Sequence, residues 1–453
     1  MSSYVTRKTP GDTAWFTHDR FGMFIHWGLY AMPARHEWVK NHECIPEDRY
    51  DLYFKHFNPD LFDPKEWARQ AKAAGMKYAV LTTKHHEGFC LFDSQYTDYK
   101  STNTPAGRDL VRAYVDAFRA EGLRVGFYYS LIDWHHPDFT IDTLHPRRND
   151  PDAFEQNKGR DMRKYAEYMR NQVRELLTNY GKIDILWFDF SYGEGNFTGD
   201  KAWMNPGKGK DEWESEKLIA LARSLQPGII IDNRAGIEQD LWTPEQIQVT
   251  EWIRHPETGE LVTWEACQTF SGSWGYHRDE TSWKSPEMLI RMLVSTVACG
   301  GNLLMNVGPT ARGYLDGRAE AALQVYADWM KLHSRSIYGC TQAEPEFTAP
   351  QDCRFTQSED GKRLYIHLFA YPFAHLCVHG LAGKIEYAQF LNDASEIRFT
   401  ERRMVHFSEG APSGDDLVVF ELPAVKPPVT VPVIEVFLKS RLVLICGCDI
   451  HAI

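Results

Sequence analysis

Residues 183–190 read IDILWFDF, a nearly continuous apolar run rich in β-branched and aromatic side chains. Such a run is typical of a strand buried on both faces, as in a parallel sheet covered by helices. Six more runs of strand character precede residue 340, at 21–27, 78–83, 125–130, 228–233, 263–270 and 302–307. Between them lie stretches with the helical period, near 64–74, 109–121, 160–179, 212–225, 286–299 and 316–334.

This alternation predicts an α/β fold in which the parallel strands close into a (β/α)-barrel of the TIM type. A doubly wound open sheet is the alternative, but the sequence has no GxGxxG motif and no P-loop to mark a nucleotide site. After about residue 340 the pattern changes to short strand-like segments without helical period, at 363–369, 386–391, 416–422 and 433–438. We therefore expect a (β/α)-barrel catalytic domain over 1–340 and an antiparallel β-sandwich over 341–453.

The composition excludes some classes of protein. With 43% hydrophobic and 25% charged residues, the 453-residue chain has the balance of a globular protein with two or three domains. Its net charge of −12 argues against nucleic acid as a partner. The sequence shows neither a secretory signal nor a membrane span, which predicts a cytoplasmic location and no membrane partner. The nine cysteines, without CxxC spacing, are expected to be reduced thiols.

Polar residues gather where the predicted strands end. Because a barrel brings the carboxyl ends of its strands to one face, these residues are expected to form one site. The motifs are FIHWG with His26, HEWV with Glu37 and Trp38, KHHEGF with His85 and His86, YYS with Tyr128 and Tyr129, LWFDF with Trp187 and Asp189, and IDNR with Arg234.

Asp189 is the most informative of these residues. A carboxylate inside an aromatic strand is costly to bury without partners, so it needs strong partners or a chemical task. It could cap the next helix or pair with an arginine of the barrel. The functional interpretation is a carboxylate nucleophile of a glycosidase.

The histidines allow three interpretations: structural groups, zinc ligands, or a polar cradle for sugar hydroxyls. A zinc site is disfavoured because the chain has no HExxH motif and no HxH pair on one strand face. We favour the cradle, in which imidazoles hydrogen-bond hydroxyls while Trp and Tyr pack on the sugar, and we expect no metal and no cofactor.

The motifs FGMFIHWG, EWV, KHHEGFCLFDS, GFYYSLIDWHH, LWFDF, IDNR, WEACQTFSGSWGY and GGNLLMNVGP, in this order, resemble glycoside hydrolase family 29, the α-L-fucosidases. The resemblance covers about residues 10–340. It implies a barrel followed by a β-sandwich, and a retaining double displacement on terminal α-L-fucosides of small molecules or oligosaccharides. Hydrolysis, with transglycosylation as the related transfer, would need no metal.

By the same resemblance Asp189 is the nucleophile that forms the covalent fucosyl-enzyme. The implied substrate-binding residues are His26, Glu37, Trp38, His85, His86, Tyr129 or else Tyr128, Trp187 and Arg234. Glu87 departs from the family pattern, which more often has Asp at that position.

The acid/base is less well marked, because the family places it in a variable loop after the fifth strand. The TPEQ segment makes Glu245 the favoured proton donor, and Glu265 of WEAC is the rival; Glu238 and Glu251 are further alternatives. A retaining enzyme needs its two carboxyls roughly 5–5.5 Å apart.

Two other functions remain as alternatives. One is a carbohydrate-binding protein that keeps the barrel without turnover, and the other is a zinc-dependent hydrolase. The aglycone preference is expected to depend on two long loops after strands, 135–158 and 191–211. A homo-oligomer is also expected.

Overall fold

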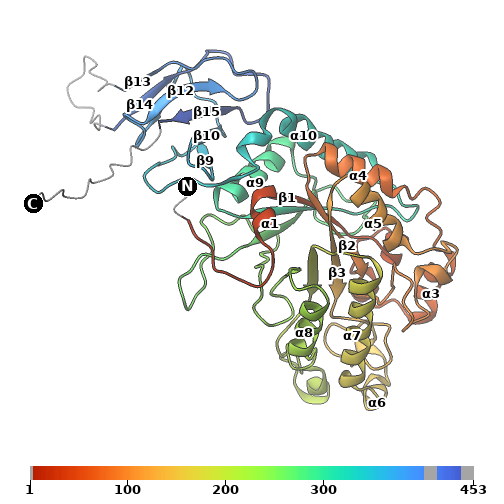
Figure 1. Cartoon of the computed structure of the whole chain (residues 1–453). Coiled ribbons are helices and arrows are strands. Elements are labelled where there is room, and N and C mark those ends of the chain that lie inside the picture. The colour runs from red at the N-terminus through yellow and green to blue at the C-terminus, as the bar shows by residue number, and fades with distance from the viewer. Residues whose placement is uncertain (1–3, 402–415, 440–453) are drawn as a thin grey trace, which may run out of the picture.

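A seven-stranded parallel sheet organises the first three quarters of the chain (Figure 1). The computed structural model describes residues 4–401 and 416–439. The sheet order is β5-β4-β3-β2-β1-β7-β6. The strands are β1 (Phe21–Ile25), β2 (Tyr78–Lys84), β3 (Arg124–Ser130), β4 (Ile185–Asp189), β5 (Ile230–Ile231), β6 (Glu265–Thr269) and β7 (Asn302–Val307). Each of the seven predicted runs overlaps one of these strands, so the prediction of a parallel α/β sheet is confirmed.

An irregular segment, 241–245, spans the gap between the two edge strands β5 and β6. Leu241 forms a single parallel bridge with Asp232, directly after β5. Trp242 and Glu245 form parallel bridges with Trp264 and Cys267 on the β6 side. Single bridges therefore link the edges of the curled sheet where an eighth regular strand would stand in a full barrel.

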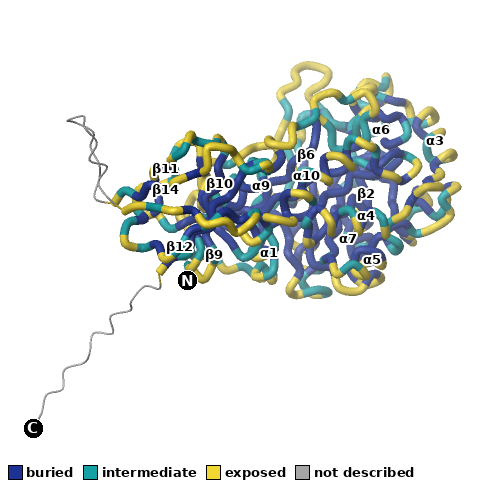
Figure 2. Tube along the Cα trace, turned by 90° about the horizontal axis from the view of Figure 1, so that it is seen from above, coloured by how far each residue is buried: buried dark blue, intermediate teal, exposed yellow. Residues whose placement is uncertain are grey.

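Helices cover the outside of the sheet, and Figure 2 shows the strands as the most deeply buried part of the chain. The main helices are α4 (Pro64–Ala73), α5 (Leu110–Ala120), α7 (Met162–Asn179), α8 (Ser215–Leu225), α9 (Pro286–Ala298) and α10 (Gly317–His333). Except for α8, each starts at an Asp or Ser whose side chain accepts a hydrogen bond from a backbone N–H of the first turn. The sequence did not predict the shorter helices α1 (Ala14–Asp19), α2 (Val39–His42), α3 (Glu47–His56) and α6 (Ala153–Asn157).

Two antiparallel sheets form the C-terminal region. One has the order β12-β15-β10-β9-β8 and contains β8 (Cys340–Gln342), β9 (Cys353–Ser358), β10 (Arg363–Leu368), β12 (Ile385–Phe390) and β15 (Val433–Leu438). The other has β11 (His375–Val378), β14 (Val418–Glu421) and β13 (Phe399–Thr400). The two sheets share one apolar cluster, to which Leu364 and Phe420 belong, and this is the sandwich arrangement. The predicted division after residue 340 stays a prediction.

Within the described residues, the cysteines do not form disulfides. The seven cysteines in the described part are free thiols, while Cys446 and Cys448 lie outside the described residues. Over residues 4–401 and 416–439, no helix has both the length and the apolar character needed to cross a membrane.

Arg20 joins the barrel to the C-terminal sheets. Its side chain is buried, with 2% of the residue exposed. Nε donates to the carbonyl of Cys340 at 2.8 Å, and Nη1 donates to the carbonyl of Gly300 at 2.7 Å. Burial lowers the pKa of Arg20 to about 10, so the guanidinium remains charged at neutral pH and needs both carbonyls as partners.

We expect Arg20→Leu to lower the free energy of unfolding by about 3 kcal/mol, because two buried carbonyls lose their charged donor. Urea titration of both forms measures the change. The control is Arg312→Leu, since Arg312 forms a surface ion pair with Asp60 and its side chain is 58% exposed; its effect should stay below about 1 kcal/mol. Equal effects of the two substitutions would contradict the structural role of Arg20.

Candidate active site

A small pocket opens at the carboxyl ends of the barrel strands. Every parallel strand from β1 to β6, or the segment directly after it, supplies at least one of its residues. The lining residues are Phe24, His26, Glu37, Trp38, His85, His86, Tyr128, Trp187, Asp189, Phe190, Arg234, Glu245, Cys267 and Trp274.

Asp189 lies at the end of β4 and is buried. Its Oδ2 accepts a hydrogen bond from the Tyr128 hydroxyl at 2.7 Å, and its Oδ1 contacts Nη1 of Arg234 at 2.9 Å. Burial, and then the charge of Asp189, raise the pKa of Tyr128 well above its ordinary value, so the phenol stays a donor. Each oxygen of the buried carboxylate thus has a polar partner in the pocket wall.

The backbone turns sharply directly after Asp189. Phe190 has a φ of 83°, which is costly for a bulky side chain. Its ring packs against Trp38 and His86, with centroid distances of 5.2 and 5.3 Å. The turn therefore ends β4 at the carboxylate and adds an aromatic ring to the pocket wall.

Arg234 connects the two candidate catalytic carboxylates. Its Nη1 contacts Asp189 Oδ1 at 2.9 Å and Glu245 Oε2 at 2.7 Å. Because one nitrogen touches both oxygens, those oxygens lie at most 5.6 Å apart. Thr243 accepts from Nε at 2.9 Å through its hydroxyl and from Nη2 at 3.1 Å through its carbonyl, which fixes the guanidinium. The Glu245 side chain is 42% exposed and lies at the open side of the pocket.

Glu265 does not line this pocket. It is fully buried inside the barrel, accepting a hydrogen bond from the Tyr78 hydroxyl and one from Trp187 Nε1 at 3.3 Å. Burial raises the pKa of Glu265 to about 7. Glu265 thus supports Trp187 from beneath, whereas Glu245 faces the pocket.

Three histidines lie side by side at the ends of β1 and β2. The rings of His85 and His86 are 3.9 Å apart, and those of His26 and His85 are 5.6 Å apart. Burial, followed by the neighbouring His85, lowers the pKa of both His26 and His86 well below the ordinary imidazole value. These two rings are therefore neutral hydrogen-bonding groups.

Aromatic rings and Glu37 complete the wall. Trp187 stacks on Tyr128 with centroids 5.8 Å apart, and Arg234 lies over the Trp187 ring at 4.5 Å. The Glu37 carboxylate accepts hydrogen bonds from the backbone N–H groups of Trp274 and Gly275, at 3.2 and 2.8 Å. Glu37 therefore holds Trp274 against the pocket in addition to lining it.

The prediction of Tyr129 as a substrate contact is corrected by the structure. Tyr129 is buried on the opposite face of β3, and its hydroxyl donates to Gln172 Oε1 of α7 at 2.8 Å. Tyr128 faces the pocket instead. The reason is the period of two in a strand, which sends adjacent side chains to opposite faces.

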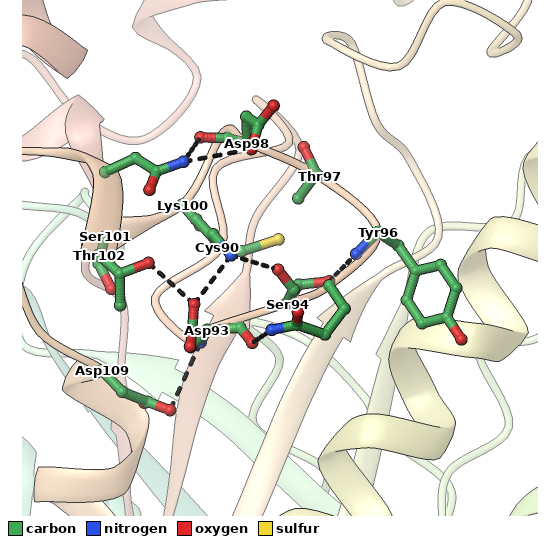
Figure 3. Close-up of polar contacts among 12 residues, drawn as sticks. Cys90, Asp93, Ser94, Tyr96, Thr97, Asp98, Lys100, Ser101, Thr102 and Asp109 are labelled. Carbon is green, nitrogen blue, oxygen red and sulfur yellow. Dashed lines mark hydrogen bonds and ion pairs between the residues drawn. The ribbon is translucent and has the colours of Figure 1, made fainter.

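The loop that follows the histidine pair is fastened by its own polar side chains (Figure 3). Lys100 Nζ contacts Asp93 Oδ1 at 2.8 Å and the carbonyl of Ser94 at 2.7 Å. The Thr102 hydroxyl donates to the same Asp93 oxygen at 2.9 Å. Cys90 pairs with Lys84, the last residue of β2. The chain thus folds back on the strand and forms a tight turn around His85 and His86.

The two long loops are pinned to each other. Lys208 forms a buried ion pair with Asp142, and the Tyr192 hydroxyl donates to the same carboxylate. Loops 135–158 and 191–211 are therefore joined to each other through the Asp142 carboxylate.

Phe190, Cys267 and Trp274 also line the pocket, and the sequence does not single them out. The strings LWFDF, WEACQTF and GSWGY contain them, but no charge or spacing sets them apart from ordinary core residues. In the described part of the chain, no group of three or more His, Cys, Asp or Glu side chains is arranged to hold a metal ion.

Comparisons with known proteins agree on one family. A family model described as alpha-L-fucosidase matches residues 2–335. Plasma alpha-L-fucosidase of Homo sapiens is 31% identical over 408 residues, covering 82% of this chain and 78% of that protein. Among solved structures, alpha-L-fucosidase isoenzyme 1 from Paenibacillus thiaminolyticus has a TM-score of 0.85 and 44% identity, over 94% of this chain and 99% of that one. A trapped covalent intermediate of a GH29 alpha-L-fucosidase from Bacteroides thetaiotaomicron, formed with 2-fluoro-fucosyl fluoride, has a TM-score of 0.77 and 27% identity, over 96% and 99%.

The buried carboxyl of Glu265 generates a stability prediction. The pKa of Glu265 is about 7 in the folded state, which exceeds its pKa in the unfolded chain. The contribution of this carboxyl to the free energy of unfolding is therefore fully present below about pH 4.5 and is lost as the pH rises to 7. Relative to Glu265→Gln, the wild type should lose about 3 kcal/mol of stability across this window. Urea titrations at several pH values measure the difference. The exposed Glu66→Gln serves as the control, and a Glu265→Gln difference that does not vary with pH would contradict the assignment.

Proposed function

The chain belongs to the alpha-L-fucosidase family of glycoside hydrolases, and we propose that it is a retaining exo-α-L-fucosidase with Asp189 as nucleophile and Glu245 as acid/base. The observation that carries this proposal is the contact of both carboxylates with one nitrogen of Arg234, which keeps the two oxygens within 5.6 Å. That separation supports a retaining mechanism, since inverting enzymes need roughly 6.5–9.5 Å for a water molecule.

In the first step, an Asp189 oxygen attacks the anomeric carbon of a terminal α-L-fucoside. A bond forms between this oxygen and the carbon, the bond to the leaving oxygen breaks, and Glu245 gives its proton to that oxygen. The hydrogen bond from Tyr128 and the charge of Arg234 hold Asp189 in place for the attack.

In the second step, Glu245 takes a proton from water, and the water oxygen attacks the same carbon. The bond to Asp189 breaks, and the sugar leaves with its original anomeric configuration. An acceptor alcohol in place of water gives transglycosylation. No step uses a cofactor.

To act as the proton donor, Glu245 must reach the glycosidic oxygen of the substrate. Its exposed position allows the side chain to turn toward a leaving group at the open side of the pocket. We propose that substrate binding breaks this ion pair, so that Arg234 keeps Asp189 alone while Glu245 reaches the glycosidic oxygen. Contacts to the leaving group would then come from the open side, where the connected loops 135–158 and 191–211 supply candidate surfaces.

Glu265 is a poorer acid/base candidate than Glu245. Its two carboxyl oxygens accept hydrogen bonds from the Tyr78 hydroxyl and from Trp187 Nε1, beneath the Trp187 ring that lines the pocket. A binding protein without turnover is the second candidate function, and a covalent adduct on Asp189 after treatment with a 2-fluoro-fucoside would exclude it. The cytoplasmic location and the homo-oligomeric state remain predictions.

Nitrophenyl α-L-fucoside hydrolysis, with azide added, tests the two roles. We expect Asp189→Ala to be inactive. Glu245→Ala should lose most activity and recover turnover with azide, giving an α-fucosyl azide of retained configuration, because the small anion replaces water on the face that the acid/base serves. Rescue of Glu265→Ala instead would move the acid/base role, and a folded but inert wild type would support the binding-protein alternative.

A matched pair of tyrosines tests the orientation of β3. Tyr128→Phe removes the hydrogen bond to Asp189 and should lower kcat/KM about 10–100-fold, as expected for a bond to a charged group. Tyr129→Phe removes a hydrogen bond on the opposite face and should leave kcat/KM within about threefold while lowering stability by about 1 kcal/mol. Steady-state kinetics and urea titration of both variants measure these effects. A larger loss of kcat/KM in Tyr129→Phe than in Tyr128→Phe would contradict the orientation of β3.

A further inference from the structure

We propose that Ser130 and Asn306 are positioning residues that fix the tautomers of His86 and His26, so that both imidazoles accept hydrogen bonds from sugar hydroxyls through Nε2. The inference rests on the proposed function and specifies how that site would recognise its sugar. At these two rings the hydroxyl of the ligand donates the hydrogen bond, and the imidazole Nε2 of the protein accepts it.

Ser130, the last residue of β3, fixes the proton of His86. The Ser130 hydroxyl donates to the carbonyl of Ile132 at 2.7 Å, and a carbonyl can only accept. The single hydroxyl proton is thereby used. His86 Nδ1 lies 2.7 Å from the same oxygen, so Nδ1 must carry the proton and donate it. In a neutral ring this leaves Nε2 as an acceptor.

Asn306 of β7 does the same for His26. Its Nδ2 donates to the carbonyl of Trp274 at 2.6 Å, which identifies the nitrogen of the amide group. The other amide atom, Oδ1, lies 2.6 Å from His26 Nδ1 and can only accept. His26 therefore also has its proton on Nδ1, and its Nε2 is an acceptor.

Both rings are neutral at ordinary pH because they are buried and because His85 lies beside them. The charged groups facing them do not reverse this. Lys84 disfavours a charge on His86, and Arg234 disfavours one on His26. The Asp189 carboxylate faces His86 from β4, but its Oδ2 is 3.9 Å from Nε2, too far for a hydrogen bond.

The two acceptor nitrogens belong to rings that line the pocket. A sugar hydroxyl that enters can satisfy them by donating its proton. A ligand group that only accepts, such as carbon-bound fluorine, would leave a buried acceptor without a partner. The pair Ser130 and Asn306 thus selects for hydroxyls over fluorine of similar size.

His85 provides an internal comparison. Its Nδ1 has no hydrogen-bond partner within the described residues, and the nearest carboxylate oxygen, Oε2 of Glu87, is 3.4 Å away. No hydroxyl or amide fixes its proton in the same way. The inference therefore applies to His26 and His86 and makes no statement about the tautomer of His85.

The direct test is nitrogen NMR of the full-length wild type labelled with ¹⁵N-histidine, because the two ring nitrogens differ in chemical shift according to which carries the proton. Single His26→Gln and His86→Gln variants assign the signals. We expect both rings to be neutral and protonated at Nδ1 at pH 7. An Nε2-protonated or doubly protonated ring at either position would overturn the proposal for that ring. This readout needs no turnover, so its outcome is separate from that of the proposed function.

Binding measurements test the consequence with L-fucose and its 2-, 3- and 4-deoxyfluoro analogues, by calorimetry. At least one analogue should bind the wild type about tenfold more weakly than fucose, the loss expected for one unpaired buried acceptor. Ser130→Ala should bind fucose more weakly but show no further loss for the analogue whose missing hydroxyl pairs with His86. Ser130→Thr, which keeps the hydroxyl, should restore the wild-type pattern. Equal binding of fucose and all three analogues by the wild type would overturn the proposal.

Discussion

The burial of one carboxylate, Asp189, is the constraint on which the site depends. Unpaired in an aromatic barrel, this charge would cost several kcal/mol. The chain compensates with a hydrogen bond from Tyr128 on the neighbouring strand and an ion pair with Arg234 after the next one. The partners reach Asp189 only because β3, β4 and β5 are adjacent and parallel, with their carboxyl ends at one face. The order of the strands thus decides which partners reach this carboxylate.

The irregular segment that closes the barrel carries two residues of the candidate active site. The segment 241–245 carries Thr243, which fixes the guanidinium of Arg234, and Glu245, which shares that guanidinium with Asp189. Besides the single bridges, backbone hydrogen bonds join Trp242 N–H to the Thr263 carbonyl and Gln246 N–H to the Cys267 carbonyl. The acid/base candidate therefore lies on an irregular segment fastened beside β6, and not on a regular strand.

Around the carboxylates, residues behind the pocket decide what the pocket residues can do. Ser130 and Asn306 contact and orient the imidazoles of His86 and His26. Glu37 holds the backbone next to Trp274, and Glu265 accepts a hydrogen bond from Trp187 inside the barrel. None of these contacts could be read from spacing along the chain, since the partners come from different strands. The family resemblance already favours Glu245 over Glu265 as acid/base, and their places in the barrel support it: Glu245 lines the pocket, and Glu265 is buried beneath it.

The sequence by itself determined the strand and helix pattern of the barrel, the presence of antiparallel sheets after residue 340, and the motifs that meet at the pocket. This was possible because burial on both faces leaves a local mark, a continuous apolar run ending in polar residues. Tertiary structure alone decided which of Tyr128 and Tyr129 faces the pocket, where Glu265 lies, and that Phe190, Cys267 and Trp274 join the wall. Neighbouring strand residues look alike in a run buried on both faces, so only the packing of the sheet against helices on one side and the barrel interior on the other distinguishes them.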